Sequence, residues 1–324
     1  MHAAWYERNG SAREVLQLGT LPMPQPAAGE VRVRLHASGV NPSDVKSRAR
    51  RPLAGPRVIP HSDGAGVIEA VGPGVSADRV GERVWVWNGQ WQRPHGTAAS
   101  HIALPADQAV ALPAAVSFDE GACLGIPALT ALQAVRLAAL QPGETVLVTG
   151  AGNAVGHYVT QLAARAGGRV IGTAGSAARQ AAAREAGAHA VIDRRSDVAA
   201  AVKDLTGGRG ADAVIDMDFS GTAPLLAQGL LRAHGRLIGY GSNEPGTVGV
   251  DFRTLLFQSL TLRFFVVYEL TPADRVAAIG ALQDLLAAGA LRHRVGAVMP
   301  LADIAAAHEA VEAGAVVGQV VLRP

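Results

Sequence analysis

The stretch VLVTGAGNAVGHYVTQLA, residues 146–163, holds the residues whose types and spacing point most directly to chemistry. An apolar run enters a glycine-rich turn, and a helical pattern follows. In a dinucleotide-binding turn, one glycine makes the tight bend, a second lets the backbone approach the pyrophosphate, and a third lets the helix pack on the strand. Here Asn153 stands in place of the second glycine, and Gly156 supplies the third.

Asn153 is compatible with dinucleotide binding. Asparagine tolerates left-handed backbone better than most other non-glycine residues, and its amide can donate a hydrogen bond to a phosphate oxygen. Gly152 precedes it, and the helix start at Ala154 and Val155 presents free N–H groups and a partial positive charge to an anion. We expect the turn to bind a dinucleotide. The alternative is a vestigial turn in a protein that no longer catalyses a reaction.

The turn belongs to a middle region in which strands and helices alternate. Short apolar runs rich in β-branched residues are separated by helical patterns and cover residues 145–150, 169–175, 190–194, 211–218, 235–241 and 261–267. This alternation predicts an α/β fold with a doubly wound parallel sheet of the Rossmann type. Ligands bind such sheets at the carboxyl ends of the strands, so Gly241 and Ser242 are candidate cofactor contacts. A plain glycine turn is the alternative.

The flanking regions predict a second domain. The first 120 residues contain short strands interrupted by Pro and Gly, which is typical of an antiparallel β unit. The tail has two helical stretches and a last strand, QVVLRP. Because the β-rich unit leaves its sheet edges without partners, we expect the tail to complete it. The predicted boundaries are 1–122 for the β-rich part, 123–267 for the Rossmann domain and 268–324 for the return.

Composition narrows the function classes. A length of 324 residues allows two cores. The net charge is only +2 and the basic residues are scattered, which argues against a nucleic-acid partner. No signal-peptide pattern and no apolar run of about 18 residues is present, so no membrane partner is expected. The single cysteine, Cys123, excludes an internal disulfide and is expected to be buried and inert. These features predict a cytoplasmic protein.

Five stretches, in this order and spacing, carry a family resemblance: SGVNPSDVKSR (38–48), HSDGAGVIEAVGPGV (61–75), LGIPALTALQAV (124–135), LVTGAGNAVGHYVTQLA (147–163) and AHEAVEAGAVVGQVVL (307–322). With them the chain resembles the zinc-independent, zeta-crystallin-like quinone oxidoreductases of the medium-chain dehydrogenase/reductase superfamily. The resemblance implies a discontinuous GroES-like catalytic domain around the Rossmann domain. It also implies hydride transfer from reduced nicotinamide to a conjugated acceptor, a quinone or an α,β-unsaturated carbonyl.

The resemblance assigns catalytic candidates near the start of the chain. In relatives the NPxD stretch lines the nicotinamide cleft, which implies this role for Asn41 and Asp44. Both residues also fit a helix N-terminus, with Asn41 as cap before a proline. Lys46 stands where quinone reductases often carry a tyrosine. Its ammonium could stabilise a developing enolate or quinol oxyanion, with a solvated lysine as the alternative.

Further cofactor contacts follow from the same resemblance. Thr130 begins a region that faces the cofactor in relatives, although it also fits an ordinary helix start. Phe265 and Val267 lie on the expected sixth strand, where relatives use backbone groups to hold the nicotinamide carboxamide; structurally, both are expected to be core strand residues.

The resemblance also implies that no metal is bound. The metal-dependent branch places a cysteine where this chain has Asn41. His61 falls near the position of a ligand histidine, but Ser62 and Asp63 follow it, so the register is off by one. His61 is therefore expected to be a loop histidine. A zinc alcohol dehydrogenase is the rival hypothesis.

The end of the second predicted strand indicates NADPH as the cofactor. An NAD-binding domain places Asp or Glu there, whereas GTAGSAARQAAARE (172–185) has no acid before its last residue. Ser176 directly follows the strand and Arg179 lies one helical turn further on. Arg194, after the third strand, is placed to close a pocket for the 2′-phosphate. Each arginine alone also fits a solvated surface position.

Two questions stay open at this point. The acceptor is either a quinone or an activated alkene, as in an enoyl or enone reductase, and a non-catalytic, crystallin-like NADPH-binding protein is a further alternative. Relatives commonly form homodimers through the nucleotide domain along the strand TLRFFVV (261–267), and we expect the same here, because an unpaired apolar edge favours aggregation.

Overall fold

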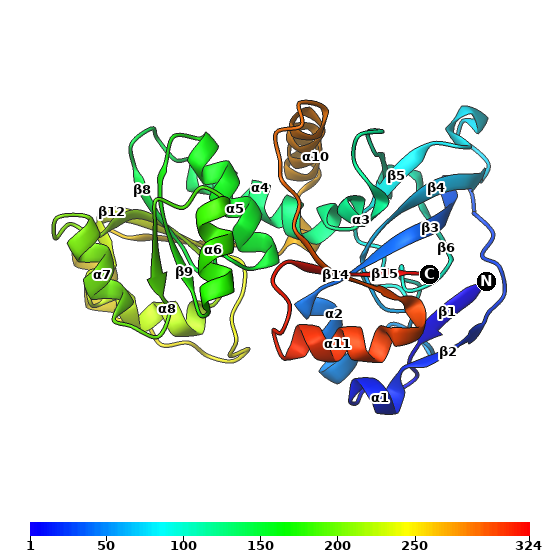
Figure 1. Cartoon of the computed structure of the whole chain (residues 1–324), viewed down its shortest axis with the longest axis horizontal. Helices are drawn as coiled ribbons and strands as arrows, with labels where there is room; N and C mark the ends of the chain where they lie inside the picture. Colours follow the sequence, from blue (N-terminus) through cyan, green and yellow to red (C-terminus); the bar gives the residue numbers. More distant parts are fainter. The chain divides into compact units, whose positions relative to one another are not determined.

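The computed structural model describes all 324 residues of the chain. The chain divides into two compact units, Met1–Ile126 with His293–Pro324, and Pro127–Arg292. Figure 1 shows the blue beginning and the red end of the chain in the same unit. The second of these units is thus inserted into the first, which is discontinuous. No helix has the length and apolar character that crossing a membrane requires.

The first unit is built on a mixed sheet of seven strands in the order β14-β15-β3-β4-β5-β7, with β6 added to β3; β14 and β15 pair in parallel, and the other neighbours are antiparallel. Alternate residues of β3, Val31, Val33 and Leu35, pack against Ile102 and Leu104 in its core. The elements of this unit are β1 (His2–Trp5), α1 (Ala12–Val15), β2 (Gln17–Thr20), β3 (Glu30–Val40), α2 (Pro42–Arg50), β4 (Asp63–Val71), β5 (Arg83–Val86), β6 (His101–Pro105), β7 (Ala109–Ala111), α3 (Phe118–Gly121), β14 (Val295–Pro300), α11 (Ile304–Glu312) and β15 (Gln319–Arg323).

The second unit contains the predicted parallel sheet, in the order β10-β9-β8-β11-β12-β13. The strands β8 and β11 are buried on both faces, which explains the apolar runs VLV and AVI within them. Its elements are α4 (Leu129–Ala138), β8 (Thr145–Val148), α5 (Ala154–Arg165), β9 (Arg169–Ala174), α6 (Ala177–Glu185), β10 (Ala190–Asp193), α7 (Val198–Leu205), β11 (Ala211–Asp216), α8 (Phe219–Leu226), β12 (Leu231–Gly239), α9 (Phe252–Phe257), β13 (Thr261–Phe264) and α10 (Pro272–Ala287).

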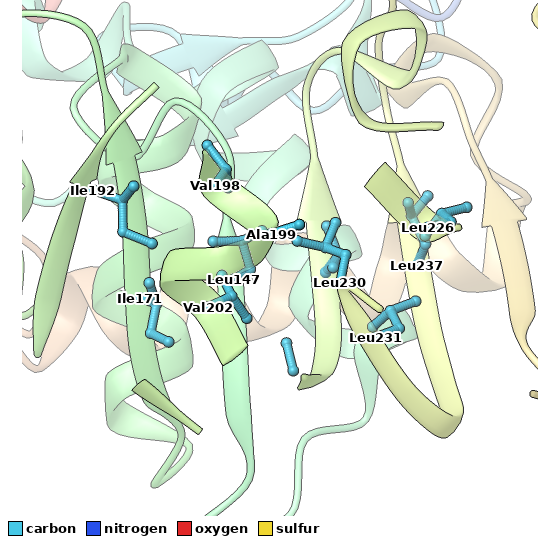
Figure 2. Packing of buried hydrophobic residues seen from close by; sticks show 12 residues of the cluster. Leu147, Ile171, Ile192, Val198, Ala199, Val202, Leu226, Leu230, Leu231 and Leu237 are labelled. Atoms are coloured by element: carbon cyan, nitrogen blue, oxygen red, sulfur yellow. The ribbon is translucent and has the colours of Figure 1, made fainter. Parts of the chain in front are cut away.

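One face of the parallel sheet packs against α7 and α8. Figure 2 shows Val198 and Val202 of α7 beside Leu147 and Ile171 of the sheet, and the same cluster extends to Leu226 of α8. The sheet order reverses between β8 and β11, because β9 and β10 lie on one side of β8 and the later strands on the other. This reversal is where open α/β sheets bind ligands.

The structure moves both domain boundaries predicted from the sequence. The first unit extends to Ile126 rather than residue 122, because Gly125 packs so tightly that a Cβ there would overlap Asp63 and the carbonyl of Val86. The return begins at His293 rather than residue 268. Residues 268–292 belong to the nucleotide-binding unit because α10 packs on α4, where Arg136 and Asp274 form an ion pair.

The return is joined to the first unit by main-chain and side-chain bonds. Strand β15 pairs antiparallel with β3, with Val320 opposite Val40. The amide of Gln319 donates to the carbonyl of Val40 at 2.9 Å. Helix α11 is held by an ion pair between its Glu312 and the buried Arg48 of α2.

A buried chain of hydrogen bonds also fastens α11, and its directions can be assigned. Thr97 donates to the Asp63 carbonyl at 2.5 Å, so Ser38 must donate to Thr97. The Nδ1–H of His61 then donates to Ser38, at 2.9 Å. The bare Nε2 of His61 accepts from Nε2–H of His308 at 2.8 Å. His61 adopts a φ of 76°, which is rare outside glycine, to reach these partners.

His61 and His308 are both neutral in the folded protein. Burial lowers the pKa of His61 to about 3 and lowers the pKa of His308 well below its ordinary value. An unfolded histidine titrates near pH 6.5. The unfolded chain therefore binds more protons below that pH, so this contribution to stability is present above about pH 6.5 and is lost as the pH falls toward the folded pKa values.

We predict that His308→Gln flattens the acid dependence of stability, because glutamine keeps an N–H donor toward His61 but does not titrate. The buried carboxyls of Asp44 and Asp63, whose pKa values burial raises, act in the opposite direction, so wild type and variant must be compared. Between about pH 4.5 and 6.5 the slopes of unfolding free energy should differ by up to about 1.4 kcal/mol per pH unit.

Tryptophan fluorescence during urea unfolding measures this difference selectively, because all four tryptophans, at positions 5, 85, 87 and 91, lie in the first unit. The exposed His2, changed to Gln, is the matched control and should keep the wild-type slope. Parallel curves for wild type and His308→Gln would contradict the assignment.

Candidate functional site

The glycine-rich turn joins β8 to α5 at the carboxyl edge of the parallel sheet. The tight bend is made by Gly150, whose φ is +66°. Asn153 is extended, with φ −88°, and serves as the N-cap residue of α5, so its tolerance of left-handed backbone is not used. Gly156 has the role expected of the third glycine, because a Cβ there would overlap the carbonyl of Gly150. The fingerprint is therefore met by backbone geometry.

The side chain of Asn153 contacts the end of a neighbouring strand. Its Nδ2 donates to the Sδ of Met217, 3.1 Å away, directly after β11. On the other side of the turn, a Cβ on Gly152 would overlap the carbonyl of Arg179 in α6. Ala154 and Val155 form the first turn of α5 and are partly exposed, so their N–H groups lie at an accessible helix start.

The residues expected to bind a 2′-phosphate lie at the ends of β9 and β10. Ser176 is the exposed N-cap of α6, and its Oγ accepts from the backbone N–H of Arg179 at 3.3 Å. Arg194 follows β10, and its backbone N–H donates to the carbonyl of Ala174, the last residue of β9. A Cβ on Gly175 would lie 2.6 Å from the Nε of Arg194, so this glycine makes room for the guanidinium.

Sequence reasoning overlooked an acid at this edge. Asp193 is the last residue of β10 and lies opposite Ala174 in the register. Its carboxylate accepts from Nε, Nη2 and the backbone N–H of Arg195, at 3.0, 2.7 and 2.9 Å. These bonds lower the pKa of Asp193 to about 2. The consecutive residues Asp193, Arg194 and Arg195 were the sequence signal for this acid. The guanidinium of Arg195 compensates the negative charge of Asp193.

Gly241 and Ser242 follow β12, as expected. The Gly241 carbonyl accepts from the N–H of Phe219 at 3.0 Å, and Ser242 Oγ donates to the Glu244 carbonyl at 2.7 Å. A cavity of about 480 Å³ opens here, and its lining includes Phe219, Tyr240, Ser242, Phe264 and Phe265. The cavity gives this end of the sheet space for a flat, partly apolar group.

The sixth strand is shorter than predicted. Strand β13 ends at Phe264, so neither Phe265 nor Val267 is a strand residue. The N–H of Phe265 still donates to the Gly239 carbonyl at 3.2 Å, but Val267 begins a short 3₁₀ turn and its carbonyl accepts from Arg275 at 2.6 Å. The carbonyl of Val267 therefore accepts from an arginine side chain and not from the backbone of another strand. Thr130 is buried in the first turn of α4.

In the first unit, Asn41 and Asp44 form the N-terminus of α2. The Asp44 carboxylate accepts from the backbone N–H of Asn41 at 2.8 Å, and burial raises the pKa of Asp44 to about 7. The Asn41 side chain donates to Asp63 at 2.9 Å and accepts from Gln319 at 3.2 Å. Lys46 is exposed on α2. Sequence reasoning overlooked Asp63 as the partner that orients the Asn41 amide.

The residues considered as metal ligands have other partners. His61 lies in the loop before β4, as expected, and its side chain is buried between Ser38 and His308. No three His, Cys, Asp or Glu side chains lie together in a way that could hold a metal ion. Cys123 is buried, as expected, and burial raises the pKa of its thiol well above the usual value.

Comparison with known proteins agrees with this geometry. Residues 27–114 match the family described as alcohol dehydrogenase GroES-like domain, and residues 154–284 match the family described as zinc-binding dehydrogenase. The chain is 34% identical to a quinone oxidoreductase from Lama guanicoe, over 91% of this chain and 89% of the relative. It is 29% identical to a 2-haloacrylate reductase from Burkholderia sp, over 92% of each protein.

Solved structures of similar proteins share the fold over the whole chain. A mycobacterial protein whose structure was solved in complex with NADPH superposes with a TM-score of 0.89 at 31% identity, and the match covers 100% of both chains. Both units therefore match known families in the same order along the chain, and the sequence identity extends over almost the whole length. The chain belongs to the quinone oxidoreductase family of the medium-chain dehydrogenase/reductase superfamily.

Proposed function

We propose that the chain is a zinc-free, NADPH-dependent reductase that delivers a hydride to a quinone or another conjugated acceptor. The observation that carries this proposal is the carboxyl edge of the parallel sheet. There a glycine turn with an accessible helix start lies beside Ser176, Arg179 and Arg194, and the acid of β10 is paired with Arg195. This edge can receive a pyrophosphate and a third phosphate.

The residues present fit a dinucleotide, because three glycines let the turn pack closely at the carboxyl edge of the sheet. Side chains are absent at Gly150, Gly152 and Gly156, where a Cβ would collide with the neighbouring backbone or with Met217. The turn would hold the pyrophosphate, and Ser176 with the two arginines would hold the 2′-phosphate. Gly241, Ser242 and the backbone of Phe265 and Val267 would orient the nicotinamide. NADPH, when bound, supplies the hydride, and the protein supplies orientation and exclusion of water.

We assign Asn41, Asp44 and Lys46 to the acceptor side. Asp44 caps the N–H of Asn41 and thereby positions it, while Asp63 and Gln319 set the plane of its amide. The exposed ammonium of Lys46 would stabilise negative charge on the acceptor oxygen as the hydride arrives. The absence of a zinc is supported by the engagement of Asn41 and His61 within the buried polar network.

The acceptor class rests on the names of the relatives. Similar proteins from Lama guanicoe, Homo sapiens and Escherichia coli are named quinone oxidoreductases, which favours a quinone. The similarity to a 2-haloacrylate reductase keeps an activated alkene as the second candidate. Both acceptors are electron-poor and conjugated, so one hydride-delivering site serves either.

The lone free cysteine, which is buried, supports a cytoplasmic location.

Oxidation of NADPH, followed with a panel of quinones, enones and acrylates, tests the function. Benzoquinone and phenanthrenequinone should be reduced by metal-free protein. Tight NADPH binding without reduction of any acceptor would instead support a non-catalytic, crystallin-like role. Stoichiometric zinc in purified protein, with activity lost to chelators, would support an alcohol dehydrogenase.

Arg179→Gln is predicted to weaken NADPH binding roughly ten- to hundredfold, because a charge-assisted contact is worth about 1.5–3 kcal/mol. NADH binding should change little, since NADH lacks the 2′-phosphate. Calorimetric titration with both cofactors measures the effect. Arg184→Gln, on the exposed end of the same helix, is the matched control. Equal losses for the two cofactors, or a wild-type preference for NADH, would refute the phosphate pocket.

Asn153→Gly should leave NADPH affinity within about 1 kcal/mol, the net value of one hydrogen bond. Asn153→Leu should weaken binding much more, because its branched side chain blocks approach of the pyrophosphate to the turn. Titration of each variant, with thermal unfolding as a check on folding, separates the two effects. Normal NADPH binding by a folded Asn153→Leu protein would show that this turn has been assigned wrongly.

We further propose a homodimer formed along β13. This strand is the edge of the parallel sheet, and Phe252, Phe257 and Phe264 near it are 71%, 71% and 52% exposed. Exposed aromatic side chains beside an unpaired strand edge favour binding of a second copy of the chain. Light scattering should give about twice 33.3 kDa. Phe257→Asp should yield monomer, whereas Val80→Asp, also exposed but in the other unit, should not. Monomeric wild-type protein would exclude this interface.

A further inference from the structure

We propose that Met217 is an oxidation site that controls dinucleotide binding, and this inference rests on the NADPH-binding function proposed above. Met217 directly follows β11, at the point where the strand order reverses. Its side chain is partly exposed. Conversion of its thioether to the sulfoxide would deform the glycine-rich turn.

The backbone of Met217 is firmly held. Its N–H donates to Thr149 Oγ1 at 2.9 Å, and that hydroxyl donates to the buried carboxylate of Asp216 at 2.7 Å. Gly241 packs against the Met217 carbonyl so closely that a Cβ would overlap it. Because these contacts fix the main chain, the position of the sulfur is determined by the side chain alone.

The sulfur occupies the space that the turn leaves open. A Cβ on Gly150 would overlap the Sδ of Met217, and Asn153 Nδ2 lies 3.1 Å from the same atom. A thioether is a weak acceptor, so this contact orients the Asn153 amide without holding it strongly. Met217 is thus a positioning residue for the two residues that shape the pyrophosphate turn.

Oxidation changes both the size and the polarity of this contact. The sulfur lone pair attacks one oxygen of hydrogen peroxide, the O–O bond breaks, an S–O bond forms, and water leaves after proton transfer. Sulfur loses two electrons and the peroxide gains them. The sulfoxide oxygen is a strong acceptor and needs volume that Gly150 and Asn153 already occupy. The turn must move, and its N–H groups leave the positions that receive the phosphates.

The proposed reaction supplies the oxidant. A quinol, the product of quinone reduction, reduces dioxygen to hydrogen peroxide and returns to the quinone. Peroxide formed in this way reaches the protein from the surrounding solution. Oxidation of Met217 would then reduce further consumption of NADPH when quinol is recycled by dioxygen.

The small number of methionines makes the inference testable. The others are Met1, Met23 and Met299, and all three belong to the first unit. Met299 is partly buried on β14, as Met217 is partly buried beside the turn. Cys123 is 1% exposed, so the thiol does not compete for peroxide. Met299→Leu is therefore the matched control for Met217→Leu.

The experiment exposes purified protein to hydrogen peroxide, maps added oxygen by peptide mass spectrometry, and titrates NADPH by calorimetry. In wild type and Met299→Leu, gain of one oxygen at Met217 should lower NADPH affinity roughly tenfold, the cost of an overpacked contact. Methionine sulfoxide reductases, supplied as both stereospecific enzymes with a thiol reductant, should restore it. Met217→Leu should show the same affinity before and after peroxide.

Three outcomes overturn the inference alone: Met217 remains unoxidised while Met299 is modified, NADPH affinity is unchanged after Met217 is oxidised, or Met217→Leu loses affinity as wild type does. Untreated, folded protein that does not bind NADPH overturns the proposed function itself, and the inference falls with it. The untreated titration therefore distinguishes the two failures.

Discussion

The pairing of β15 with β3 is the constraint on which the rest of the first unit depends. It makes the beginning and the end of the chain parts of one sheet, so the segment between them forms an inserted unit. Asn41 comes directly after β3, and Gln319 at the start of β15 contacts both its amide oxygen and the preceding carbonyl. The orientation of a catalytic candidate is thus set by a residue close to the other end of the chain.

In the nucleotide-binding unit, order at the carboxyl edge arises from the absence of side chains. The loops after β8, β11 and β12 touch through Gly150, Met217 and Gly241, and the same turn touches α6 through Gly152. Close contact between backbones leaves little freedom for any one loop to move alone. This edge is therefore a set of mutually supporting turns on a buried parallel sheet, which suits the cofactor site proposed here.

The sequence predicted the parts of this structure that depend on local pattern. Six apolar strands, the glycine turn, Arg179 and Arg194 all appeared as short-range signals, and the structure places the turn and the two arginines in the segments that follow β8, β9 and β10. The partners that orient side chains were not predictable in this way. His61 and His308 are 247 residues apart, and Asn41 meets Asp63 across two strands. The sequence of α10 does not indicate which unit the helix packs on. The structure therefore places the start of the return at His293 and not at residue 268.

The same sheet pairing has a consequence for synthesis of the chain. Val40 emerges from the ribosome 279 residues before Gln319, its partner. The inserted unit, Pro127–Arg292, is complete earlier and can fold while the last segment is still being made. The β-rich beginning must wait, with one side of the end of β3 unpaired. A chain that stops short of its last strand therefore combines a complete inserted unit with a first unit whose sheet keeps an unpaired edge.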